Sequence, residues 1–104
     1  MTYEEKLERL RALMERETAE RYAIEYPLLQ PDSVRVIRGR KWTRVDRCQG
    51  ANSTLSSGVY MVDRVGNIYG IRAYGVPDPR RQFGTLDTVG AYSWGGYAAH
   101  RKEV

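Results

Sequence analysis

A dense group of basic side chains in the middle of the chain is the first feature whose residue types suggest chemistry. Residues 33–47 hold six basic side chains against one acid, Asp46, which gives the stretch a net charge of +5. Guanidinium groups bind phosphate oxygens in a bidentate manner, and an exposed indole offers a surface on which an unpaired base stacks. The sequence therefore predicts a nucleic-acid-binding site formed by Arg38, Arg40, Lys41, Trp42, Arg44, Arg47, Arg80 and Arg81.

The same segment has two alternative interpretations. Trp42 could lie in the core, since tryptophan buries a large apolar area readily. The cations could form a solvated face or attract an acidic protein. The binding hypothesis requires Trp42 to be partly open and five cations to share one face, namely Arg38, Arg40, Lys41, Arg44 and Arg81.

Metal and nucleophile chemistry find little support in the residue types. A zinc site needs three or four ligands, and Cys48 and His100 are the single cysteine and histidine of the chain. The same two residues make a Cys–His nucleophile pair improbable, so we expect no catalytic residue, no metal and no cofactor. A lone cysteine cannot form an intramolecular disulfide, which in so small a domain favours the cytoplasm.

One short pattern suggests an enzyme. Gly58-Val59-Tyr60, followed after a turn by Ile68-Tyr69-Gly70, resembles the opening of a GIY-YIG nuclease. In that family two strand tyrosines and a downstream arginine, here Arg80 or Arg81, act on the scissile phosphate, and a glutamate holds a divalent metal. The second motif is Tyr-Gly-Ile rather than Tyr-Ile-Gly, and no glutamate occurs between residues 25 and 103. We therefore expect a non-enzymatic protein and keep a degenerate nuclease as a remote alternative.

A second pattern covers roughly the C-terminal half. The stretch from Val62 to Ile71, with Tyr74-Gly75 and then Phe83 to Asp87, is similar to small uncharacterised bacteriophage proteins that share a VDR…G-x-IY…P…G-x-L-D order. The resemblance implies a viral origin and a host-cell cytoplasm. It gives no residue a role.

The elements that must position these residues begin with a helix. Thr2 and Glu5 have the spacing of a capping box, and Tyr3, Leu7, Leu10 and Met14 recur on one helical face. Pro27 disfavours helical geometry in the residue before it. The pattern predicts a helix over about residues 3–25, within an N-terminal unit 1–26, and places Leu10 at the contact with the sheet.

Alternation with period two replaces the helical period near Ser33 and predicts antiparallel strands within residues 33–76. One hairpin turns at Gly39-Arg40 and a second at Gly66-Asn67. Leu28 and Leu29 are expected to fill the gap between helix and sheet. Residues 77–104 are rich in glycine and aromatic residues and are expected to form an irregular tail, packed through Tyr92, Trp94 and Tyr97.

Composition agrees with one folded domain over residues 1–104 of the α+β class, an N-terminal α-helix packed on a small twisted antiparallel β-sheet. An apolar content of 41% and a charged content of 29% are typical of globular proteins. No apolar run approaches the length of a membrane span, so we expect no membrane association. The functional hypothesis is a small basic protein that binds nucleic acid. The alternative is an interaction module for an acidic host or viral protein, and the oligomeric state stays open.

Overall fold

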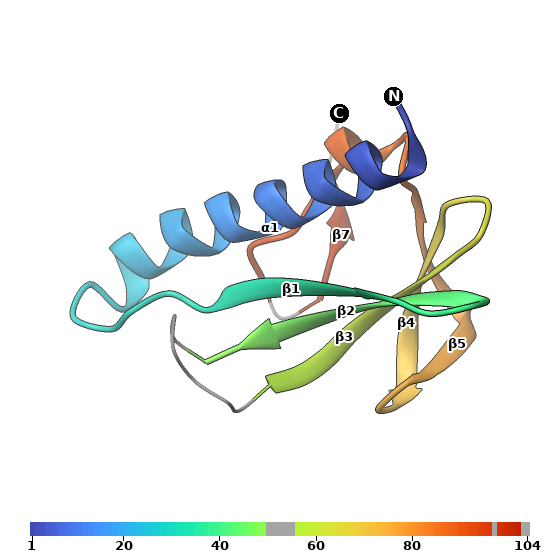
Figure 1. The fold of residues 1–104 in the computed structure, drawn as a ribbon. Helices are drawn as coiled ribbons and strands as arrows, with labels where there is room; N and C mark the ends of the chain where they lie inside the picture. The colour runs from blue at the N-terminus through green and yellow to red at the C-terminus, as the bar shows by residue number, and fades with distance from the viewer. Residues whose placement is uncertain (50–55, 97, 103–104) are drawn as a thin grey trace.

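The computed structural model describes residues 1–49, 56–96 and 98–102, and it confirms the α+β class (Figure 1). A single long helix lies across one face of a five-stranded antiparallel sheet whose strands follow the order of the sequence. The elements are α1 (Tyr3–Glu25), β1 (Ser33–Arg38), β2 (Trp42–Cys48), β3 (Ser56–Asp63), β4 (Asn67–Ala73), β5 (Val76–Thr85), the 3-10 turn η1 (Val89–Ala91), β6 (Tyr92–Ser93) and β7 (His100–Arg101). The last two strands pair with each other as a separate small sheet.

The helix begins at the predicted capping box. The Glu5 amide donates to Thr2 Oγ1 at 3.1 Å, and the Thr2 amide donates to Glu5 Oε1 at 3.0 Å. These bonds satisfy two backbone donors that a helix start would otherwise leave without partners. The helix ends one residue before Tyr26, whose N–H still bonds to the Tyr22 carbonyl. Pro27 then prevents its continuation.

The core lies between α1 and the inner face of the sheet. Leu7, Leu10 and Met14 are buried on one face of the helix, as their spacing predicted, and Leu10 has no exposed surface. Thr18 continues this buried face one turn later. Side chains from β2, β3 and β4 meet the helix there, with Val45, Tyr60, Val62 and Ile68 in the same apolar cluster.

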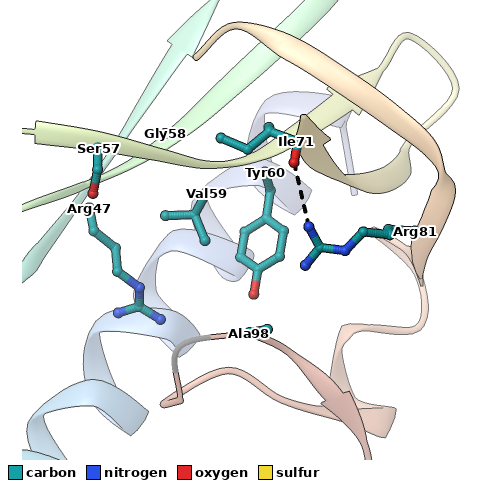
Figure 2. A pocket seen from close by; sticks show the side chains of 8 residues that line it. All are labelled: Arg47, Ser57, Gly58, Val59, Tyr60, Ile71, Arg81 and Ala98. Carbon is teal, nitrogen blue, oxygen red and sulfur yellow. Dashed lines mark hydrogen bonds between the residues drawn. The ribbon is translucent and has the colours of Figure 1, made fainter. Parts of the chain in front are cut away.

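The C-terminal segment closes the core from the side. Trp94 is fully buried, and its indole N–H donates to the Val89 carbonyl at 2.9 Å. Its backbone N–H donates to Glu17 Oε1 at 2.8 Å, which fixes the segment against α1. Figure 2 shows Ala98 of this segment beside the hydroxyl end of Tyr60. The expected packing is confirmed for Trp94, whereas Tyr97 lies outside the described residues.

The connector between α1 and β1 does not fill the core. Leu28 is 97% exposed and Leu29 61% exposed, so the prediction that they lie between helix and sheet is wrong. A tight turn, in which the Leu29 amide donates to the Tyr26 carbonyl, directs the segment away from the sheet. Figure 1 shows this connector protruding beyond the end of the sheet.

Residues 76–85 form a strand, which corrects the prediction that the irregular tail begins at residue 77. Two prolines hide the strand in the sequence, because proline cannot donate to a ladder and is tolerated only at an edge or a bulge. β5 is an edge strand that pairs with β4 alone. Tyr69 pairs with Gln82 and Gly70 with Asp78, so residues 79–81 bulge out of the ladder.

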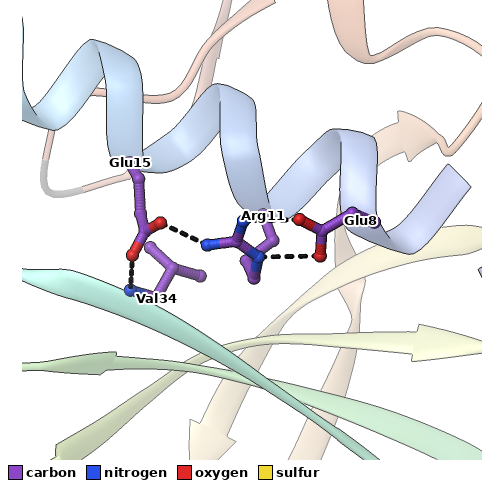
Figure 3. Close-up of polar contacts among 4 residues, drawn as sticks. All are labelled: Glu8, Arg11, Glu15 and Val34. Atoms are coloured by element: carbon purple, nitrogen blue, oxygen red, sulfur yellow. Dashed lines mark hydrogen bonds and ion pairs between the residues drawn. The ribbon is translucent and has the colours of Figure 1, made fainter. Parts of the chain in front are cut away.

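The opposite edge of the sheet is covered by the helix. The backbone N–H of Val34, at the start of β1, donates to Glu15 Oε1 at 3.0 Å (Figure 3). The other oxygen of Glu15 binds Arg11, which also donates from Nε to Glu8 at 2.8 Å. A carboxylate from α1 thus pairs with an edge-strand donor and sets the helix against β1.

Candidate nucleic-acid interface

The strand register divides the predicted basic site between two faces of the sheet. Arg38 pairs with Thr43, and Tyr3 Oη of the helix lies 3.2 Å from Thr43 Oγ1, so this pair faces α1. Arg44 pairs with Ile37 in the next position and therefore points to the open face. The five cations of the binding hypothesis do not share one surface.

Arg38 joins the β1–β2 hairpin to the start of the helix. Its guanidinium lies 4.8 Å from the centre of the Tyr3 ring and forms an ion pair with Glu4. Because both partners belong to the first turn of α1, this arginine contributes to the position of the hairpin.

Arg47 points into the protein rather than to solvent. Its Nη1 donates to Thr18 Oγ1 at 2.7 Å, and its Nη2 donates to the carbonyls of Trp94 at 2.8 Å and Gly96 at 3.1 Å. Burial lowers the pKa of Arg47, an effect that the fields of Tyr60 and Asp32 oppose. The side chain links β2, α1 and the C-terminal segment.

Arg80 and Arg81 lie at the bulge of β5 and do not extend the hairpin surface. Arg80 pairs with Asp78 at 3.5 Å, and its backbone N–H donates to the same carboxylate, which lowers the pKa of Asp78. Arg81 lies 5.7 Å from the ring centre of Phe83, and its Nη1 is 3.4 Å from the Ile71 carbonyl (Figure 2).

The open face of the sheet gathers aromatic side chains instead. Trp42 and Tyr69 are both half-buried and meet edge to face, with ring centres 5.8 Å apart. Tyr74, 55% exposed, lies beneath the Arg44 guanidinium at 4.6 Å. Trp42 is therefore partly open, as the binding hypothesis requires, and it has an aromatic neighbour on its own face.

The carboxylate of this face is buried beneath those side chains. Asp46 has no exposed surface, and its Oδ2 accepts from Tyr74 Oη at 3.2 Å. Arg44 Nε lies 3.3 Å from Oδ1 and 3.4 Å from Oδ2. The contact to Oδ1 lacks hydrogen-bond geometry, so that oxygen has no hydrogen bond within the described part of the chain. The negative charge is thus shielded from anything that approaches the face.

Three cations lie at the end of the sheet where two turns meet. Arg40 and Lys41 occupy the β1–β2 turn, Arg64 occupies the β3–β4 turn, and all three line one depression of about 170 Å³. Trp42 borders this depression from the open face, and Tyr3, Arg38 and Thr43 border it from the helix side. No ion pair neutralises these three side chains among the residues described here. The nearby Asp63 is occupied, because it accepts the backbone N–H groups of Val65 at 3.2 Å and Asn67 at 2.8 Å.

Sequence reasoning missed Arg64, Tyr69 and Tyr74 as members of this surface. The hairpin sequence alone does not place Tyr69 here, because its position near Arg44 depends on the register of Met61 with both residues across β2, β3 and β4. Arg64 could have been found from the two turns, since a meander of antiparallel strands places alternate turns at the same end. Tyr74 follows β4 and offers no comparable signal.

The residues of the nuclease-like pattern are not brought together. Tyr69 pairs with Met61, so it lies on the face opposite to Tyr60. Tyr60 is 1% exposed, and its hydroxyl oxygen accepts the Ala99 N–H at 2.8 Å. Within the described residues, no group of three or more His, Cys, Asp or Glu side chains is placed to hold a metal ion.

Comparison with family models, with curated proteins and with solved structures finds no match to this chain. Of the helices among the described residues, none combines the length and the apolar composition that crossing a membrane requires. Function is therefore inferred from the residues and their geometry.

Proposed function

We propose that the protein binds single-stranded nucleic acid across the open face of its sheet. The observation that supports this proposal most is the half-buried but partly open Trp42–Tyr69 pair. Beside Trp42, Arg40, Lys41 and Arg64 line one depression without carboxylate partners among the described residues. Aromatic platforms on an uncovered sheet, bordered by cations, are a recurring arrangement for unpaired bases.

The chemistry favours a single strand over a duplex. A base stacks on an aromatic ring only when its own face is free, and duplex bases are already stacked on their neighbours. The cations at the hairpin end would bind the phosphates on either side of the stacked base. Arg35, which is exposed on β1, adds positive charge to the same face, where Arg44 is paired with Asp46.

The test measures affinity for a short fluorescent DNA or RNA strand by anisotropy at low ionic strength. Trp42→Ala is expected to weaken single-strand binding by roughly 1–3 kcal/mol and duplex binding less. Tyr26→Ala is the matched control, because Tyr26 is an exposed aromatic at the far end of α1 and should leave affinity unchanged. Circular dichroism of each variant separates lost binding from lost folding. No binding by the folded wild type, or equal losses in both variants, would refute the proposal.

A specific observation favours a second candidate, a protein-interaction module. Ile24, Tyr26, Leu28 and Leu29 are all exposed where α1 meets its connector, with Leu28 at 97%. Exposed apolar clusters of this kind often mark contacts between proteins. If the chain is phage-encoded, as its C-terminal pattern implies, the partner would be a host or viral protein. Leu28→Ser with Leu29→Ser should then abolish a complex isolated from the native host while leaving nucleic-acid affinity unchanged.

A further inference from the structure

A pocket on the helix side of the sheet contains two arginines that the open face does not use. It lies between β3, β4, the bulge of β5 and the C-terminal segment, and its volume is about 250 Å³ (Figure 2). Arg47 borders it on one side and Arg81 on the other, with Val59 and Tyr60 between them. The volume is slightly below the roughly 300–1,000 Å³ of typical ligand pockets, which limits it to a small molecule.

Arg47 is a half-buried cation whose hydrogen bonds go only to uncharged oxygens, and Asp32 acts on it only through its field, without an ion pair. Its three hydrogen bonds go to a threonine hydroxyl and two backbone carbonyls. Its Nε–H and second Nη1–H have no hydrogen-bond partner among the described residues, and no carboxylate there lies within ion-pair distance. A cation removed from water is normally paired with an anion, because its desolvation otherwise costs several kcal/mol.

Arg81 provides a second cation on the opposite wall. A glycine permits its position, since a Cβ at Gly70 would lie 3.1 Å from Arg81 Cζ and 3.2 Å from the Phe83 ring. The missing side chain lets the guanidinium lie close to the backbone of β4. Arg81 has no ion pair with a described residue, and its carbonyl contact to Ile71 is long at 3.4 Å.

Tyr60 lies between the two arginines (Figure 2). Burial raises the pKa of its hydroxyl, and the hydrogen bond from the Ala99 N–H, followed by the fields of Arg47 and Arg81, opposes that rise. The hydroxyl oxygen accepts the Ala99 N–H, so the phenol is held at the floor of the pocket. The Ser57 hydroxyl and the apolar side chains of Val59 and Ile71 complete the walls.

We propose that this pocket binds a small organic oxyanion, a carboxylate or a phosphate monoester, between Arg47 and Arg81. The Arg81 guanidinium presents forked donors that match such oxygens, Arg47 adds its charge and its two remaining N–H groups, and the apolar walls suit a short carbon skeleton. The site is separate from the nucleic-acid proposal, because Arg47 and Tyr60 point to the helix side of the sheet and none of its lining residues belongs to the Trp42–Tyr69 surface.

The experiment is an NMR titration of the whole chain that follows the Ala99 amide and the Arg47 Nε–H group. The probes are inorganic phosphate, glycerol phosphate and succinate, each compared with chloride at equal ionic strength. Saturable shifts are expected with at least one probe, and the one that saturates identifies a phosphate or a carboxylate. If none saturates, the pocket is not an anion site and the proposal fails.

Two substitutions distinguish the pocket from general attraction to a basic protein. Arg81→Ser is expected to weaken binding roughly tenfold through loss of charge-assisted hydrogen bonds, and its exposed position should spare the fold. Arg80→Ser removes the same charge one residue away, outside the pocket, and should leave affinity unchanged. Equal losses in both variants would overturn the assignment. Gly70→Ala should weaken binding with no change in charge, and Trp42→Ala should have no effect.

Discussion

At the residue scale, two arginines a few positions apart have opposite roles, one inside the fold and one on the surface. Arg47 donates to oxygens of residues 18, 94 and 96, whereas Arg40 lies exposed at a turn without an ion pair to a described residue. Nothing in the local sequence separates them, because the partners of Arg47 come from distant parts of the chain. Its role in the fold could not have been predicted from the basic segment alone.

Tyr60 gives the first residue-scale prediction. Tyr60→Phe leaves the Ala99 N–H without its acceptor in a buried position, which should destabilise the protein by about 1–3 kcal/mol. Chemical denaturation measures the loss, and faster hydrogen exchange at Ala99 would locate it. Tyr69→Phe is the control, since that hydroxyl has no hydrogen bond to a described residue. Equal stability of the two variants would contradict the assigned hydrogen bond. DNA cleavage by the wild type that Tyr60→Phe abolishes would contradict a non-enzymatic role.

Leu10 gives the second prediction at the residue scale. Leu10→Ala removes a side chain with no exposed surface from the contact between α1 and the sheet. The loss of burial and the cavity left behind should lower the free energy of unfolding by roughly 2–5 kcal/mol. Ala12→Ser, on the exposed side of the same helix, should change it by less than about 0.5 kcal/mol. An unchanged denaturation midpoint for Leu10→Ala would mean that the helix does not pack as described.

At the scale of elements, the parts with strong local signals were predictable. A few neighbouring residues were enough to predict α1, from the capping box and the spacing of Leu7, Leu10 and Met14. The turn at Gly66 predicted the β3–β4 hairpin in the same way. β5 was missed because Pro77 and Pro79 interrupt its alternation, and only pairing with β4 holds those residues extended. The open face was missed for a related reason, since it depends on the register between β2, β3 and β4.

The capping box predicts how the helix responds to acid. Hydrogen bonds from the Thr2 amide and hydroxyl lower the pKa of Glu5 from its ordinary value of 4.5. The Glu5 carboxyl therefore binds a proton more readily in the unfolded chain than in the folded one. The stabilisation that the ionised carboxylate gives the fold is complete above about pH 4.5, and it is lost as the pH falls through the pKa of Glu5 in the folded protein. Glu5→Gln should lower the melting temperature at pH 7, and the difference from wild type should shrink at pH 3. A difference that stays constant with pH would contradict the ionised cap.

At the scale of the whole molecule, charge is divided between two layers. The helical segment 1–26 holds seven acidic and five basic side chains, for a balance of −2, whereas residues 33–47 have a balance of +5. α1 covers one face of the sheet, and the turns at one end of the sheet hold three cations that have no ion pair with a described residue. Arg38 and Arg47 of that stretch face α1, so the open face and its turn hold Arg35, Arg40, Lys41 and Arg44 against Asp46. A polyanion is therefore expected to be attracted more strongly to this side than to the helix, which would orient it before contact.

This polarity predicts a specific dependence of binding on salt. Phosphate contacts release condensed counterions, so the logarithm of single-strand affinity should fall with the logarithm of salt by about 0.7 per contact. Replacing Arg40, Lys41 and Arg64 with serine removes up to three contacts and should flatten the slope by ~2 units. A matched variant with serine at Arg9, Arg16 and Lys102, which line a depression on the helix side, changes net charge equally and should keep the wild-type slope. If both triple variants flatten the slope alike, attraction follows net charge alone and the open face is not the interface.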